Sequence, residues 1–224
     1  MKQPVVDYKN FRFSRLNEPQ YSHIKLLAGW LVYFAFYFLT ENLIPADRCH
    51  PMHCVIDDLV PFREGFVIFY VSWFLLIIIS LLYFFLYDIQ SFRDLSWFII
   101  ITQIVAMAVY IVYPNRQDLR PETFADRNVF TWVLSIIYTF DTPTGVCPSL
   151  HVAYSIGIGS AWLKKKDASP VWKAVLVVWI VMICLSVMFV KQHSAVDVLC
   201  ALPLGLLAEL IVYRKRYFGR RPEA

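Results

Sequence analysis

The stretch FVIFYVSWFLLIIISLLYFFLY, Phe66–Tyr87, decides the fold class of this chain. It contains no charged residue, and serine is the only small polar residue in it. The hydrocarbon core of a bilayer is about 30 Å thick, and a helix needs roughly 20 apolar residues to cross it. The stretch therefore predicts a membrane-spanning helix.

The rest of the chain follows the same pattern. Of its 224 residues, 58% are hydrophobic and only 17% are charged, and the mean hydropathy is +0.53. A soluble domain usually carries about 25% charged residues. Four more runs reach or approach a spanning length: Leu26–Leu43, Leu95–Tyr113, Val171–Val190 and Ser194–Tyr213. A further run, Pro148–Leu163, is shorter, so its first turn is expected to lie slightly below the membrane surface.

These runs predict an all-α integral membrane protein, a six-transmembrane-helix bundle. The segment VFTWVLSIIYTF, Val129–Phe140, is apolar but too short to span. We interpret it as an interfacial or re-entrant helix in the loop between the third and fourth spans.

Lysine and arginine collect on the cytoplasmic side of membrane proteins. With both termini inside, most of the 21 basic residues of this chain become cytoplasmic. We therefore expect a cytoplasmic N-terminal segment (1–25), a six-helix membrane catalytic domain (26–213) and a basic cytoplasmic tail (214–224). The net charge of +4 then follows from topology and requires no nucleic-acid partner. The expected location is the plasma (cytoplasmic) membrane.

The segment CHPMHC, Cys49–Cys54, invites a zinc-site interpretation. Ligands that are adjacent in so short a loop make poor tetrahedral geometry, so we disfavour metal binding there. A local Cys49–Cys54 disulfide or two free thiols are the alternatives that remain.

Ionisable side chains at membrane depth are costly and therefore mark functional candidates. His151, His193 and Asp197 are predicted to share a depth at the outer membrane boundary. His193 and Asp197 are four residues apart, so they lie on one face of the last span. A carboxylate bonded to one imidazole nitrogen leaves the other nitrogen basic and aimed, which suits a nucleophilic histidine. Small residues in the fourth and sixth spans should let these helices pack closely and bring the two histidines together.

The segment CPSLH, Cys147–His151, opens the fourth span. Pro148 suits the first turn of a helix, and the free N–H groups of that turn form an anion site. Arg116, Arg120 and Lys191 could surround the site with cations that match phosphate oxygens. This set suggests phosphoryl transfer through a phosphohistidine. Paired carboxylates that would hold Mg²⁺ are lacking, so we expect a metal-independent reaction without a cofactor.

The pattern resembles the type 2 phosphatidic acid phosphatase (lipid phosphate phosphatase) superfamily, whose members share a six-helix membrane core. The family signatures KxxxxxxRP, PSGH and SRxxxxxHxxxD correspond to YPNRQDLRP (Tyr113–Pro121), PSLH (Pro148–His151) and SVMFVKQHSAVD (Ser186–Asp197). Order and spacing agree, and the resemblance covers roughly residues 66–213. It implies that His193 is the nucleophile, that Asp197 orients it, and that His151 protonates the leaving oxygen. Arg120 and the region of Ser149 would hold the phosphate.

The chain departs from the family pattern at three positions. Tyr113 stands for the lysine of the first motif, Val187 for the arginine of the third and Leu150 for the glycine of PSGH. We expect Arg116 and Lys191 to replace the two lost cations. The sequence PSLH and the missing arginine are similar to the inositolphosphorylceramide synthase branch, in which an alcohol accepts the phosphoryl headgroup.

Three functions are therefore considered. The first is a lipid phosphate phosphatase that acts on a phosphomonoester or diphosphate lipid taken from the bilayer. The second is a headgroup phosphotransferase of the inositolphosphorylceramide or sphingomyelin synthase type, which uses the same intermediate. The third is a non-catalytic membrane scaffold or carrier, against which the retained His151, His193 and Asp197 argue.

Overall fold

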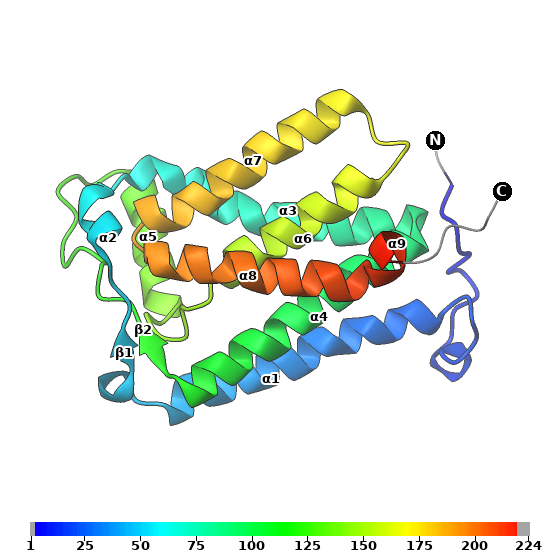
Figure 1. The fold of residues 1–224 in the computed structure, drawn as a ribbon, viewed down its shortest axis with the longest axis horizontal. Helices are drawn as coiled ribbons and strands as arrows, with labels where there is room; N and C mark the ends of the chain where they lie inside the picture. Colours follow the sequence, from blue (N-terminus) through cyan, green and yellow to red (C-terminus); the bar gives the residue numbers. More distant parts are fainter. Residues whose placement is uncertain (1–2, 219–224) are drawn as a thin grey trace.

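The computed structural model describes residues 3–218, so the last residues of the predicted basic tail lie outside the described part. Nearly all of its regular structure is helical (Figure 1). The long helices are α1 (Ala28–Leu43), α3 (Val67–Tyr87), α4 (Ile89–Val112), α6 (Leu150–Lys164), α7 (Pro170–Phe189) and α8 (Ala195–Val212). The shorter ones are α2 (Val55–Leu59), α5 (Val129–Phe140) and α9 (Arg214–Phe218), with 3-10 turns η1 (Phe13–Arg15), η2 (Ser22–Leu27), η3 (Ala46–Arg48) and η4 (Glu64–Phe66).

Within residues 3–218, five helices are long and apolar enough to cross a membrane. They cover Ser22–Thr40, Glu64–Tyr87, Ile89–Val112, Pro170–Phe189 and Ala195–Val212. The prediction of an all-helical, multi-pass membrane protein is thereby confirmed. Helix α6 has 15 residues, which leaves it short of that length.

Helix α6 occupies the centre of the bundle, where it packs against α3, α4, α7 and α8 (Figure 1). Most of its side chains are buried, and its small residues allow close approach. Gly157 faces the ring of Phe98 on α4, while Ile156 faces Gly205 on α8. The predicted close packing of the fourth and sixth hydrophobic runs is therefore confirmed.

Gly157 provides a stability prediction. A Cβ atom at this position would lie 2.5 Å from Cδ1 of Phe98, a ring that is fully buried. Overpacking usually costs about 1–3 kcal/mol, which should exceed the gain of about 1 kcal/mol in helix propensity on going from glycine to alanine. Gly157→Ala should therefore lower the melting temperature of the purified protein in detergent by several degrees. Gly65→Ala is the control, since nothing lies within 4 Å of its added Cβ, and an unchanged melting temperature for Gly157→Ala would contradict the packing.

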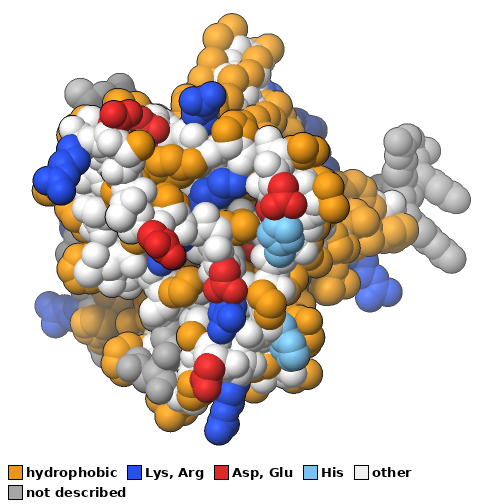
Figure 2. Space-filling model, turned by 90° about the vertical axis from the view of Figure 1, so that its left-hand side faces the viewer, with side chains coloured by type: hydrophobic (Ala, Val, Ile, Leu, Met, Phe, Trp, Pro, Cys, Tyr) orange, Lys and Arg blue, Asp and Glu red, His pale blue; other side chains and the backbone are white. Residues whose placement is uncertain are grey.

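The loops at one end of the bundle are joined by a small parallel sheet, in which β1 (His50–Pro51) pairs with β2 (Asn115–Arg116). Helix α5 lies at the same end and contacts α3 and η4 (Figure 1). Trp132 and Phe140 of α5 are exposed whereas Leu134 is fully buried, as expected of an amphipathic helix at an interface. Seen face-on, this end shows acidic and basic side chains scattered among apolar ones (Figure 2).

The CHPMHC segment forms part of this end. Cys49 and Cys54 are free thiols, which is one of the two alternatives left open by the sequence. The His50 ring stacks on Tyr113 at a centroid distance of 4.4 Å, and His53 Nε2 lies 2.8 Å from Asp58 Oδ1. Among residues 3–218, no group of three or more histidine, cysteine or acidic side chains is arranged to hold a metal ion.

Candidate active site at the starts of α6 and α8

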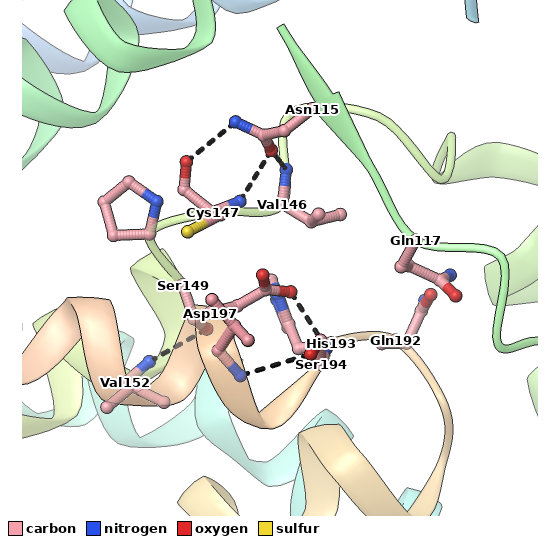
Figure 3. Close-up of polar contacts among 12 residues, drawn as sticks. Asn115, Gln117, Val146, Cys147, Ser149, Val152, Gln192, His193, Ser194 and Asp197 are labelled. Carbon is pink, nitrogen blue, oxygen red and sulfur yellow. Dashed lines mark hydrogen bonds and ion pairs between the residues drawn. The ribbon is translucent and has the colours of Figure 1, made fainter. Parts of the chain in front are cut away.

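The candidate site is built where α6 and α8 begin side by side. The Ser149 side chain caps α6 by accepting from Val152 N at 3.5 Å, and the Ser194 side chain caps α8 by accepting from Val196 N at 3.1 Å. Ser149 N also donates to the backbone carbonyl of Asp197 at 3.1 Å. This bond joins the two helix starts, which fixes the segments that carry the predicted catalytic residues (Figure 3).

The predicted His193–Asp197 pair is present. His193 Nδ1 lies 3.2 Å from Asp197 Oδ2, which also accepts from Ser194 N at 2.9 Å (Figure 3). The Asp197 side chain is fully buried, and His193 is 8% exposed. Because the carboxylate engages Nδ1, the nitrogen available for chemistry on this ring is Nε2.

His151 faces the pair from α6. Its ring centroid lies 5.7 Å from that of His193, in an edge-on arrangement. Trp73 and Tyr70 of α3 stack on the His151 ring at centroid distances of 4.0 and 4.6 Å. Its Nε2 is buried and makes no hydrogen bond within the described residues. The structure thus brings together all three residues that the sequence assigned to catalysis.

Both histidines line a cavity of about 640 Å³. Its wall includes Trp30, Tyr33, Phe34 and Tyr37 of α1, side chains of α3 from Tyr70 to Leu81, Tyr110, the segment 141–146, Leu150 and Tyr154 of α6, and Gln192. The wall is therefore mostly aromatic and aliphatic, with a few polar groups close to the histidines. Such a lining is typical of a site for a largely apolar ligand.

Arg120 lies next to this cavity and bonds to protein oxygens. Its Nε donates to Gln192 Oε1 at 2.9 Å, and its Nη1 donates to the Asp141 carbonyl at 2.9 Å. The guanidinium also lies over the ring of Tyr138, 4.7 Å from its centroid. Burial lowers the pKa of Arg120, while the charge of Asp141 acts in the opposite direction. Gln192, the residue that precedes His193, thus connects Arg120 to the segment that carries the predicted nucleophile.

The other two predicted phosphate-binding cations point elsewhere. Lys191 Nζ donates to the carbonyls of Asp57 and Val60, at 3.0 and 2.6 Å. Arg116 donates to the carbonyl of Ala46 at 2.6 Å and to Asp118 Oδ2 at 3.1 Å. Neither residue belongs to the cavity wall described above. Their role in phosphate binding stays a prediction.

The sequence interpretation missed several polar residues that organise the site. Asn115 Oδ1 accepts from Val146 N at 2.9 Å and from Cys147 N at 2.8 Å, and its Nδ2 donates to the Cys147 carbonyl at 3.0 Å (Figure 3). It thereby shapes the loop that leads into α6. Asn115 and Gln192 both lie inside the motif segments, and their position there was the only sequence feature that could have marked them as part of the site. Asp57 was missed as well, because it lies far outside any motif.

Comparison with known proteins returned nothing, since no protein-family model, no curated protein and no solved structure matches this chain.

Proposed function

We propose that the chain is a six-helix membrane lipid phosphate phosphatase that works through a phosphohistidine without a metal ion. One observation carries this proposal. His193, paired with the buried Asp197, faces His151 in a largely apolar cavity, and the two imidazole ring centroids are 5.7 Å apart. A scaffold or carrier would have no use for an imidazole oriented by a buried carboxylate. The resemblance of the three motif segments to the phosphatase superfamily supports the same assignment.

The reaction follows from the positions of the two histidines. His193 Nε2 attacks phosphorus, and the bond between phosphorus and the lipid oxygen breaks. His151 gives its proton to the departing lipid alcohol, and then takes one from the water that attacks the phosphohistidine. The P–N bond breaks, inorganic phosphate leaves, and both imidazoles return to their starting states. Charge that develops on the phosphoryl oxygens would be stabilised by nearby N–H groups and cations.

The cavity supports a lipid as the substrate. Phe34, Phe74 and Ile78 line the cavity and are also more than half exposed on the apolar flanks of α1 and α3. A lipid could therefore enter from the bilayer between these helices with its phosphate directed at the histidines. In this arrangement α6 completes the bundle as the sixth span, both termini are cytoplasmic, and the site opens on the extracytoplasmic side of the plasma membrane.

One observation favours headgroup phosphotransfer as a second candidate. Arg116, Arg120 and Lys191 all bond to protein oxygens, and no lysine or arginine is among the described residues that line the cavity. A phosphomonoester carries close to two negative charges, whereas a phosphodiester carries one. A site poor in cations suits the diester that a headgroup transferase would use.

The test is phosphate release by the purified protein in detergent from phosphatidate, phosphatidylglycerophosphate and a polyprenyl diphosphate. We expect release from at least one of them to be unchanged by EDTA, because no step uses a metal. Parallel reactions with phosphatidylinositol as donor and a lipid alcohol as acceptor detect headgroup transfer. Loss of all activity in EDTA would contradict the metal-free mechanism, and transfer without phosphate release would select the second candidate.

A further inference from the structure

Helix α2, in the loop between α1 and α3, is packed against the segment that carries His193. The two segments are 137 residues apart in sequence at their closest side-chain contact, between Asp57 and Ser194. Asp57 is 4% exposed, whereas its neighbour Asp58 lies on the surface with its side chain 65% exposed. Two adjacent carboxylates of one short helix thus occupy opposite environments.

The Asp57 carboxylate holds the first turn of α8. Its Oδ2 accepts from Ser194 Oγ at 2.5 Å, and its Oδ1 accepts from Ala195 N at 2.7 Å. Oδ2 also accepts from Cys54 N at 2.8 Å, which ties the carboxylate to its own helix. A negative charge at the start of a helix is favourable because the N-terminal N–H groups are unpaired and partly positive. Asp57 therefore stabilises the start of α8, directly after His193.

The same segment is held from the other side. Lys191 Nζ donates to the carbonyls of Asp57 and Val60, and Arg63 N donates to the Phe189 carbonyl at 2.9 Å. Lys191 has φ 52°, a left-handed conformation that is uncommon for a residue with a side chain. The sharp turn before His193 is thus fixed by contacts to α2 on both of its flanks.

The charge state of Asp57 suits this role. Burial raises the pKa of Asp57, but hydrogen bonds from Ser194, Ala195 and Cys54 outweigh burial and bring this pKa below its usual range. The Asp57 carboxylate is consequently ionised over the whole neutral pH range, so its hydrogen bonds to Ser194 and Ala195 do not change with pH in that range.

We propose that Asp57 is a positioning residue for His193, acting through Ser194 and Ala195, and that α2 is a clamp on the nucleophile's turn. This inference rests on the proposed phosphoryl transfer. The imidazole must reach phosphorus with its Nε2, and a misplacement of about 1 Å in a reacting group can cost about 100-fold in rate. Loss of the Asp57 contacts frees the backbone on the C-terminal side of His193, while the Asp197 contact remains.

The experiment compares Asp57→Ala and Asp57→Asn with the matched control Asp58→Asn. Each variant is mixed in saturating excess with ³²P-phosphatidate in detergent micelles, and the disappearance of labelled phosphatidate is followed through a single turnover. We expect the rate constant of Asp57→Ala to be about 100-fold lower than that of the wild type. Asp57→Asn keeps the shape and part of the bonding, so its loss should be smaller. Asp58→Asn should match the wild type.

The dependence on protein concentration separates positioning from folding. A variant that only contains fewer folded molecules would reach the wild-type rate constant once the protein is in saturating excess. This result would overturn the proposal, as would unchanged rate constants in both Asp57 variants. Hydrogen exchange of the peptide 189–197 provides a readout that does not depend on activity, and it should accelerate in Asp57→Ala but not in Asp58→Asn. If the wild type consumes none of the labelled phosphatidate, the proposed function fails for this lipid, and the exchange comparison alone decides whether the clamp exists.

Discussion

Replacing His193 by alanine is expected to remove turnover almost completely, by about 10⁴-fold or more, because covalent catalysis loses its nucleophile. The other imidazole in the cavity cannot substitute for it. His151 is stacked on Trp73 and Tyr70, and it has no carboxylate partner within the described residues to raise its basicity. The variant should still bind lipid, because the apolar wall of the cavity does not depend on the His193 ring.

The measurement is steady-state phosphate release together with acid-labile, base-stable ³²P incorporation, the signature of a phosphohistidine. His53→Ala is the control, since His53 lies in the loop between α1 and α3 and pairs with Asp58. It should retain both signals, whereas His193→Ala should lose both. Turnover that survives in His193→Ala would show that the oriented imidazole is not the nucleophile and would remove the main support for the proposed function.

Much of the framework was predictable because it depends on local patterns. The membrane class followed from apolar runs such as Phe66–Tyr87, since a bilayer imposes a minimum length on any spanning helix. The His193–Asp197 contact was predicted from the four-residue spacing and is present. The prediction that both residues lie on one helical face was wrong, because α8 begins at Ala195 and His193 lies in the turn before it. Gly157 and Gly205 indicated close helix packing, which the structure confirms through their contacts with Phe98 and Ile156.

The surroundings of these residues were not predictable in the same way. The sequence interpretation assigned Lys191 and Arg116 to phosphate because they stand near the motifs, but proximity in sequence does not determine where a long side chain points. Lys191 instead reaches the carbonyl ends of α2, a helix that no motif marks. Asp57 could not be found from its sequence context, since its partners Ser194 and Ala195 come from the opposite end of the chain. A single sequence carries no signal for contacts of this range.

The short length of α6 was predictable from the sequence, whereas its central position in the bundle was not. A run of 15 residues is too short to cross a bilayer unaided, yet it is the most enclosed helix of the bundle. Its N-terminal turn carries His151, which lines the cavity together with His193.

The role of His151 leads to the second large effect. His151→Ala should lower turnover of phosphatidate by about 10²–10⁴-fold, because the departing lipid alkoxide must be protonated and general acid catalysis typically contributes that much. The loss should depend on the leaving group. With 4-nitrophenyl phosphate the departing nitrophenolate is stable without a proton, so formation of the phosphohistidine should slow by less than about 10-fold.

Hydrolysis of the phosphohistidine provides a second test of the role of His151. In the proposed mechanism, water loses a proton to His151 as it attacks the phosphohistidine, so the variant should form the intermediate quickly and hydrolyse it slowly. Stopped-flow absorbance of His151→Ala with 4-nitrophenyl phosphate should therefore show a burst of nitrophenolate close to one equivalent per protein, followed by slow turnover. The wild type should show a smaller burst or none, because its intermediate is hydrolysed as fast as it forms. Equal losses for the lipid and the nitrophenyl ester, without a burst, would show that His151 supports the fold of the site and does not transfer the proton.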